Sequence, residues 1–239
     1  MQVIRCLALL AAFAFAMPPA PSEAVAGASL AALPSAYAGA RQTPALFGTR
    51  EIYSRDISAF GKWTDVLARF RLEQAAARSG CAGEPACDEW REMLGALGGL
   101  DLRAKLDLVN SAVNRHPYVA SQSNWGESNH WETPFEFLRK SGQCQDYAIT
   151  KYLLLRAAGV PAAQLRVLVL RDTELGLDHA VTVAYVDGAA LLLDNQISTV
   201  VPVDSVRHYQ PYYSINEAGW WLHVGPHARY ASAEDGALR

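Results

Sequence analysis

One segment of the sequence, residues 145–158, is apolar on nearly every side. A helix without a polar face must be covered all round, so this pattern predicts a central buried helix. Gly159 and Pro161 supply ordinary signals for its end. The rest of the chain must surround this helix, and 239 residues are enough for one sizeable domain with a proper core.

Helical periodicity precedes the apolar segment. Apolar residues recur at helical spacing in three stretches, which predicts helices that face a core. The three stripes are Trp63, Leu67 and Phe70; Trp90, Met93, Leu94 and Leu97; and Leu102, Leu106, Val109 and Val113. Thr133-Pro134-Phe135-Glu136 then predicts a capping box that opens a short helix to about Lys140.

Strand patterns follow the apolar segment. Residues 165–170 are rich in strand-forming types, and residues 179–186 alternate between apolar and polar. Asp187-Gly188 is a hairpin turn signal, and residues 190–193 supply the return strand. The predicted order is therefore helices first, then an antiparallel sheet, with the buried helix between them. That order indicates the α+β class.

The N-terminus carries the marks of an export signal. Arg5 is followed by an apolar run, residues 6–16, that is too short to span a membrane, and Ala24-Val25-Ala26 forms a cleavage site. Cleavage after Ala16 or Ala38 is an alternative. We predict a signal peptide over residues 1–26, a flexible Ala/Gly/Pro/Ser-rich tether over 27–46, a single domain over 47–230 and a disordered tail over 231–239. A periplasmic or secreted location follows.

Export exposes the cysteines to an oxidising compartment. Cys81 and Cys87 lie in a Gly/Pro-containing loop and are close enough in sequence to form a disulfide. Cys144 is then the odd cysteine in a secreted chain, which calls for an explanation. An inert buried cysteine is one explanation. The other is a nucleophile, because the start of a helix favours thiolate, and its free N–H groups can bind an oxyanion.

A histidine and an aspartate lie on the predicted hairpin. With a two-residue turn at Asp187-Gly188, His179 faces Gln196, and Asp194 falls on the same face of the sheet. Such diagonal neighbours are roughly 7–8 Å apart at the backbone, close enough for a carboxylate to orient an imidazole. One more turn residue would put the two groups on opposite faces. A core histidine and a strand-end cap explain each residue alone, but the pair downstream of Cys144 favours a Cys144–His179–Asp194 catalytic triad.

These residues resemble a known family, the bacterial transglutaminase-like cysteine proteinases, whose best-known members are periplasmic enzymes of the LapG type. The similarity extends from about Phe47 to Trp221. It is carried by Trp125-Gly126, Trp131-Glu132-Thr133-Pro134, Gly142-Gln143-Cys144-Gln145-Asp146-Tyr147-Ala148, Gly159-Val160-Pro161, His179-Ala180-Val181 and Leu193-Asp194-Asn195. The resemblance implies a papain-like core in which Cys144 attacks a peptide carbonyl, His179 transfers protons and Asp194 orients His179.

The resemblance also suggests partners. It implies a protein or peptide substrate, with a large surface adhesin in biofilm control as one candidate, and a membrane-bound cyclic-di-GMP receptor as a candidate regulator. Transglutaminase or amidase activity by the same triad stays open, as does a peptide-binding pseudoenzyme that cuts nothing. Nucleic acid is not expected as a partner, because the formal net charge is −3 and no Lys/Arg-rich run occurs.

The residues beside the nucleophile differ from the family pattern. The family usually has acids on both sides of the cysteine, and these help to bind the Ca²⁺ on which LapG-type enzymes depend. Here the positions hold Gln143 and Gln145. Because Ca²⁺ prefers several charged carboxylate oxygens, we expect no metal site and no cofactor, although Glu127, Asp146 and Asp172 remain as acids.

Four other features are interpreted as structural. His223 and His227 are separated by Gly225-Pro226, so they are assigned to the surface rather than to zinc. Asn110 and Asn114 share a helix face, which favours structural hydrogen bonds. Trp220-Trp221 is interpreted as a hydrophobic closing segment. Trp125 and Trp131 either wall a cleft or pack.

Overall fold

The computed structural model describes residues 43–225. The predicted signal peptide, the predicted tail and most of the predicted tether lie outside this range. Among the described residues, no helix is long and apolar enough to cross a membrane. The helices are α1 (Gly61–Arg78), α2 (Pro85–Ala96), α3 (Leu102–Val113), α4 (Ser121–Trp125), α5 (Pro134–Lys140) and α6 (Cys144–Ala157). The strands are β1 (Arg50–Ser54), β2 (Leu165–Asp172), β3 (Leu177–Val186), β4 (Ala189–Leu193), β5 (Val201–Pro202), β6 (Tyr209–Ile215) and β7 (Trp220–Val224).

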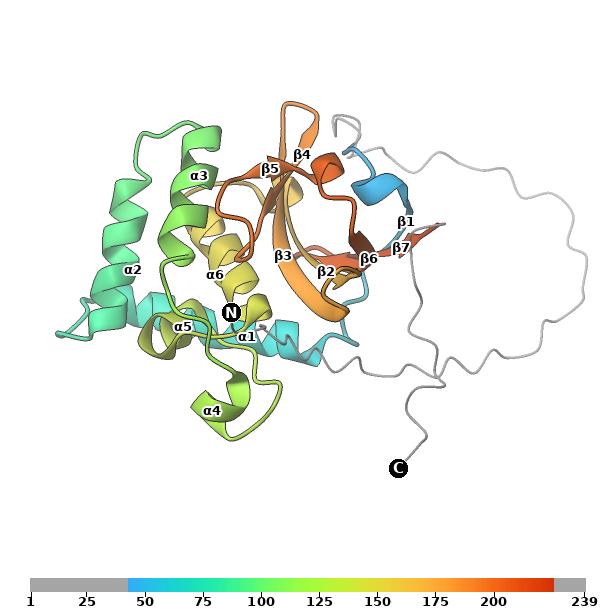
Figure 1. Ribbon diagram of the computed structural model, residues 1–239. Helices are drawn as coiled ribbons and strands as arrows, with labels where there is room; N and C mark the ends of the chain where they lie inside the picture. Colours follow the sequence, from blue (N-terminus) through green and yellow to red (C-terminus); the bar gives the residue numbers. More distant parts are fainter. Residues whose placement is uncertain (1–42, 226–239) are drawn as a thin grey trace, which may run out of the picture.

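Helices and sheet form two sides of the molecule. Figure 1 shows the helices gathered on one side and the strands on the other, with α6 beside β3. The strands form one sheet in the order β1-β7-β6-β2-β3-β4-β5, and every strand pair is antiparallel. The predicted α+β class is confirmed. The central helix α6 packs against β2, the middle strand of the sheet, and against its neighbour β3.

The central helix is buried as its composition predicts. Residues 144–155 of α6 are all buried, so the helix has no solvent face. It packs against α3 and α5 on one side and against β2 and β3 on the other. The hydroxyl group of Thr182 on β3 donates to the carbonyl oxygen of Ala148 over 2.7 Å, which joins the helix to the sheet by a polar contact as well.

The centre of the sheet is covered on both faces. Val167 and Val169 of β2 belong to the core shared with the helices. Leu168 and Leu170 belong to a second core that also contains Leu46. Side chains alternate along a strand, so neighbouring apolar residues serve two different cores. This explains why residues 167–170 of β2 form a continuous apolar run.

The two ends of the described chain meet at one edge of the sheet. β1 precedes every helix and pairs with β7, so that Tyr53 lies opposite Trp221 and Ser54 opposite Trp220. The predicted order, with all strands after the helices, is therefore wrong for β1. The prediction failed because β1 and its partner β7 are far apart in the sequence. No turn signal joins them, so no local sequence pattern indicates that they pair.

The loop before α2 contains the predicted disulfide. Cys81 and Cys87 are joined by a bond of 1.97 Å, with their Cα atoms 5.4 Å apart. Cys87 lies in the first turn of α2, where its amide donates to the Glu84 carboxylate.

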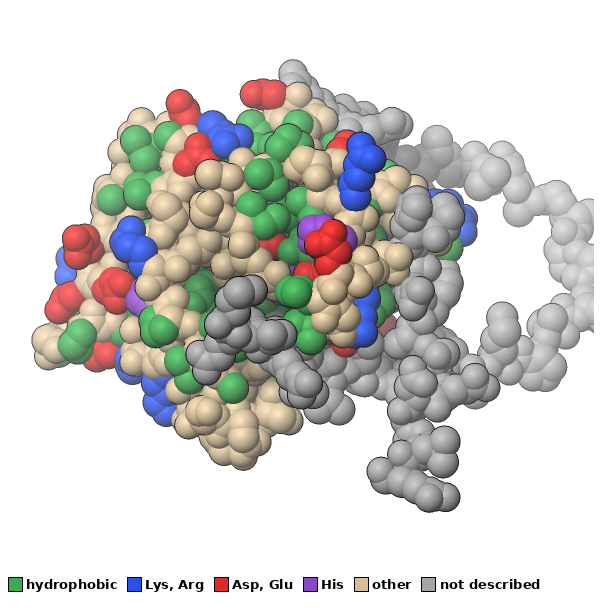
Figure 2. All heavy atoms as spheres, in the orientation of Figure 1, with side chains coloured by type: hydrophobic (Ala, Val, Ile, Leu, Met, Phe, Trp, Pro, Cys, Tyr) green, Lys and Arg blue, Asp and Glu red, His purple; other side chains and the backbone are tan. Residues whose placement is uncertain are grey.

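The surface charges are mixed. On the face drawn in Figure 2, Lys and Arg side chains are interspersed with Asp and Glu, with no single basic patch.

Candidate active site

Cys144 is the first residue of α6, one residue earlier than the predicted helix start. The chain arrives from α5, whose Thr133–Glu136 capping box and Pro134 are present as predicted. Between the helices Ser141 has a left-handed backbone (φ 60°), which turns the chain sharply toward Cys144. The nucleophile candidate is therefore set at a helix N-terminus, where backbone N–H groups point outward.

The turn before Cys144 is held by the carboxylate of Asp146. One oxygen, Oδ2, accepts from the Gln143 amide over 2.8 Å, and the other, Oδ1, accepts from the Glu132 amide over 2.9 Å. Gly142 has no room for a side chain, because an added Cβ would lie 2.6 Å from Asp146 Oδ2. This packing fixes the backbone on which Cys144 sits.

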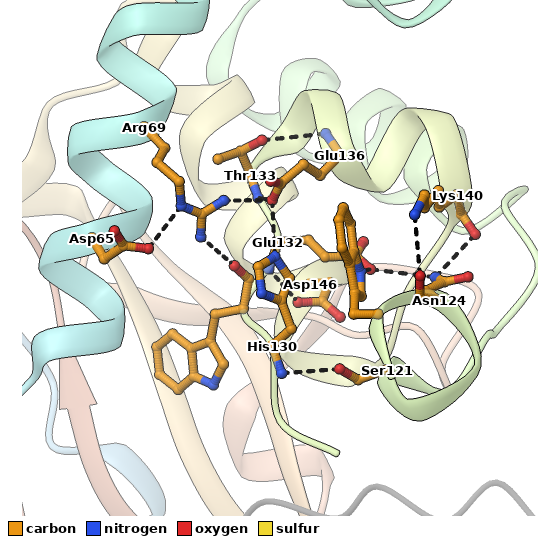
Figure 3. A network of polar contacts seen from close by, with 12 residues as sticks. Asp65, Arg69, Ser121, Asn124, His130, Glu132, Thr133, Glu136, Lys140 and Asp146 are labelled. Carbon is orange, nitrogen blue, oxygen red and sulfur yellow. Dashed lines mark hydrogen bonds and ion pairs between the residues drawn. The ribbon is translucent and has the colours of Figure 1, made fainter. Parts of the chain in front are cut away.

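A second carboxylate, that of Glu132, lies next to Asp146 in the polar network of Figure 3. Trp125 donates its indole N–H to Glu132 Oε1 over 2.6 Å. Burial raises the pKa of Glu132 to about 7, despite the hydrogen bonds that it accepts. Burial, and then the charge of Glu132, raise the pKa of Asp146 well above its usual range. Two buried acids therefore lie beneath the nucleophile turn, and they resist holding two full charges.

The hairpin has the predicted register. Val186 pairs with Ala189 and Thr182 with Leu193, so the turn contains only Asp187 and Gly188. His179 on β3 and Asp194 just beyond β4 then meet: His179 Nε2 lies 2.8 Å from Asp194 Oδ1. The expected contact between imidazole and carboxylate is present in the structure.

Asp194 is held by more than the histidine. Its Oδ2 accepts from the hydroxyl group of Tyr209 on β6 over 2.6 Å, and its Oδ1 also accepts from the Gln196 amide over 2.9 Å. Burial raises the pKa of Asp194, but the charge of His179 and these hydrogen bonds outweigh it, so the pKa is lowered overall. Asp194 is therefore a stable carboxylate whose position is fixed on three sides.

The second nitrogen of the histidine faces a different group. His179 Nδ1 lies 3.5 Å from the side-chain nitrogen Nε2 of Gln196, which is able to donate to it. With Nε2 bound to Asp194, the neutral imidazole keeps its proton on Nε2 and leaves Nδ1 as an acceptor. Cys144 and Ala180, the neighbour of His179, belong to the same buried cluster. The three predicted site residues thus lie on α6, on β3 and at the end of β4, three elements that pack together.

Three residues of this region escaped the sequence analysis. Tyr209 reaches Asp194 only because β6 pairs with β2, which no local pattern announces. Glu132 was part of the family resemblance and preceded the capping box, but neither signal gave it a site role. Lys151 did leave one: it is a lone cation in an otherwise apolar helix, and its side chain is completely buried. A buried charge of this kind needs a partner, so its position was a clue.

The other residues singled out from the sequence lie elsewhere. Asp172 accepts from the amides of Glu174 and Leu175, so it caps a turn. Glu127 is 3.8 Å from His130, and among residues 43–225 no group of three or more His, Cys, Asp or Glu residues is arranged to hold a metal ion. His223 is buried, so its assignment to the surface is wrong. It lies on β7, between the edge strand β1 and β6. His227 falls outside the described range.

Comparison with known proteins identifies similar chains. A family model described as "Bacterial transglutaminase-like cysteine proteinase" matches residues 86–229. The solved structure of Legionella pneumophila LapG is 29% identical, with 64% of this chain and 87% of that chain covered and a TM-score of 0.55. Calcium-bound and EGTA-treated structures of the same Legionella protein match with the same identity and TM-score, covering 87% and 84% of those chains. A search of curated proteins gives no match.

Proposed function

Because this chain belongs to the bacterial transglutaminase-like cysteine proteinases, and is thus a cysteine peptidase, we propose that Cys144, His179 and Asp194 are its catalytic triad. The observation that carries the proposal is the 2.8 Å contact between His179 and Asp194, combined with a cysteine at the N-terminus of a helix packed on the same strand. The type of peptidase we infer is a thiol endopeptidase.

The steps follow from these positions. His179 Nδ1 takes the proton of Cys144, and the thiolate attacks the carbonyl carbon of the scissile peptide bond. The imidazolium then gives that proton to the departing amine as the C–N bond breaks, which leaves an acyl-enzyme thioester. Water, deprotonated by His179, attacks the thioester, and the thiol is regenerated with a free carboxylate product.

Two features support this sequence of steps. Asp194 keeps the imidazole in the tautomer that accepts at Nδ1, and its lowered pKa keeps it charged while the imidazolium forms. The amides at the start of α6 supply donors for the negative oxygen of the tetrahedral intermediate. Tyr209 contributes by restraining the far oxygen of Asp194.

Calcium fits the residues beside Cys144 poorly. Both oxygens of Asp146 are occupied by backbone amides, and Gln145 donates its side-chain amide to Asp146 Oδ2 over 3.3 Å. A carboxylate at position 145 would instead place a further negative charge against Asp146, which a bound cation would relieve. We infer that hydrogen bonds from neutral amides replace a metal ion here, so the chain needs no cofactor.

Chelation tests that inference. We expect EGTA to leave most of the peptidase activity intact, whereas a Gln143→Asp/Gln145→Glu variant should gain calcium binding, measured by calorimetry. The wild-type chain without chelator is the control for each assay. Loss of wild-type activity in EGTA, restored by added Ca²⁺, would show that the remaining acids and the backbone still form a working calcium site.

The substrate we propose is a protein of the cell surface, with a large adhesin in biofilm control as the leading candidate and a periplasmic or secreted location for the enzyme. A membrane-bound cyclic-di-GMP receptor is the proposed regulator. These proposals rest on the family pattern around Cys144 and on the predicted signal peptide in residues 1–26. They require that the substrate present an extended, accessible segment, because the attack needs a carbonyl in line with the thiolate.

The decisive experiment uses candidate surface proteins encoded near this gene. Purified enzyme and its Cys144→Ala variant are incubated with each candidate, and new product termini are sequenced. We expect one defined cut with wild type and none with Cys144→Ala. Incorporation of a fluorescent primary amine instead of a cut would indicate acyl transfer, and tight binding without either product would indicate a pseudoenzyme.

A further inference from the structure

The loop that follows β4 carries Asp194 out of the sheet. The last ladder residue of β4 is Leu193, which pairs with Thr182, so Asp194 lies one residue beyond the regular strand pairing. The chain does not rejoin the sheet until Val201 at the start of β5. The backbone of Asp194 is therefore not held by strand pairing, and contacts from outside the sheet must fix its position.

Two asparagines of α3 supply such contacts. Asn114 donates its side-chain amide to the carbonyl oxygen of Asp194 itself over 2.7 Å. Asn110, one turn earlier on the same helix, donates to the carbonyl oxygens of Ile197 over 3.4 Å and Ser198 over 3.2 Å. The structural hydrogen bonds predicted for this pair are present, and they reach the start and the middle of one loop.

A buried lysine fixes the orientation of one asparagine. Lys151 of α6 donates from Nζ to Asn110 Oδ1 over 2.9 Å, and the lysine side chain is completely buried. The carbonyl end of Asn110 therefore faces Lys151, which donates to it. The NH₂ end is thereby directed to the loop carbonyls. The helix that begins with Cys144 and the loop that carries Asp194 are thus tied through a single amide.

The hydrogen bonds of the two asparagines are shielded from water. Asn110 is buried and Asn114 partly buried, so water does not easily replace either bond. Burial lowers the pKa of Lys151 to about 7, and the negative charge of Asp194 opposes that change, so the two groups sense one another. The charged or titratable groups around Asp194 are His179 from β3, Tyr209 from β6 and Lys151 from α6.

We propose that Asn114 and Asn110 are positioning residues of the active site, which hold the loop after β4 so that the Asp194 carboxylate stays in contact with His179. The inference rests on the triad proposed above. The proposal gives α3 a function beyond packing. Its two asparagines position the Asp194 carboxylate, while its apolar residues pack against α6. Lys151 acts behind Asn110 by setting which end of that amide meets the loop.

The first test measures Asp194 directly and needs no substrate. In the full chain with ¹³C-labelled aspartate, the carboxyl signal of Asp194 is followed against pH for wild type, Asn114→Ala and a control, Ser111→Ala. Ser111 is exposed on the same helix and bonds only within it. Asn114→Ala leaves every charged group near Asp194 in place, so a change in the titration reports position and not charge.

We expect the pKa of Asp194 to rise by about half a pH unit or more in Asn114→Ala, because the bonds from His179, Tyr209 and the Gln196 amide loosen together. Ser111→Ala should titrate as wild type does. An unchanged Asp194 titration in a folded Asn114→Ala protein would overturn the proposal and leave Asn114 with a packing role only.

A second variant acts on the middle of the loop. Asn110→Ala removes both bonds to Ile197 and Ser198, and hydrogen exchange of the Gln196 amide, which is bound to Asp194, is the measurement. We expect that exchange to be about tenfold faster than in wild type. Equal protection in the two proteins would contradict the proposal. Because neither measurement depends on cleavage, loss of the proposed peptidase function would leave both results interpretable.

Discussion

Two histidines of this sheet are equally buried but have opposite surroundings. His179 on β3 contacts the carboxylate of Asp194 at 2.8 Å. His223 on β7 contacts two hydroxyl groups instead, those of Thr49 at 2.9 Å and Ser214 at 3.0 Å. Burial, and then the charge of Arg166, lower the pKa of His223 to about 3. Equal burial thus accompanies different contacts: His179 bonds directly to a carboxylate, whereas His223 bonds to two hydroxyl groups.

The nearby ions explain the contrast. A carboxylate, Glu51, also lies 3.9 Å from His223, but it is paired with Arg166 at 2.7 Å. That guanidinium is stacked 3.7 Å from the ring of Trp221, so its position is fixed. The negative charge near His223 is thus already paired with a guanidinium, whereas Asp194 is bonded to His179, to the Tyr209 hydroxyl group and to the Gln196 backbone amide. His223 joins Thr49, which precedes β1, to Ser214 on β6, and the proposed general base His179 joins β3 to Asp194.

The largest expected effect separates the two histidines by activity. His179→Gln should lower kcat/KM by about a thousandfold or more, because the general base is lost. His223→Gln should change it by no more than about threefold, since Gln still offers polar atoms to the two hydroxyl groups. Steady-state cleavage assays on both variants, with circular dichroism to confirm folding, make the comparison. Equal losses in two folded variants would contradict it.

The carboxylates beside the two histidines provide the next comparison. Asp194→Asn should reduce kcat by about a hundredfold to ten-thousandfold, because the amide no longer fixes the tautomer of His179. Glu51→Gln should leave kcat near wild type and lower the free energy of unfolding instead, since Arg166 then lacks its ion-pair partner. Kinetics and urea unfolding of the same two preparations are required. A large kcat loss in Glu51→Gln would remove the distinction between the two sites.

The smallest effect concerns acid stability. The folded pKa of His223 is depressed to about 3, below the unfolded value of about 6.5, so the stability from neutral His223 is present above that value and is lost as pH falls. Between about pH 7.5 and pH 5 the loss should be on the order of 2 kcal/mol. His223→Gln should lack this component when urea unfolding is compared at the two pH values. Parallel pH profiles would show that His223 is protonated in the fold.

The hairpin and the central helix were predictable for a local reason. Side chains alternate along a strand, and Asp187-Gly188 fixes the turn length, so the shared face of His179 and Asp194 follows from counting. Likewise an apolar surface all round residues 145–158 left only a buried helix as a solution. These expectations depend on neighbours in the sequence, where spacing and geometry are directly linked.

The remaining contacts depended on residues that are distant in the sequence. The sequence by itself determined the helix that presents Cys144, the hairpin that joins His179 to Asp194, and the disulfide between Cys81 and Cys87. Only the tertiary structure decided that Tyr209 and Asn114 restrain Asp194 and that His223 is buried beside Arg166. The physical reason is that local periodicity specifies which face a side chain takes but not which distant strand or helix will cover that face.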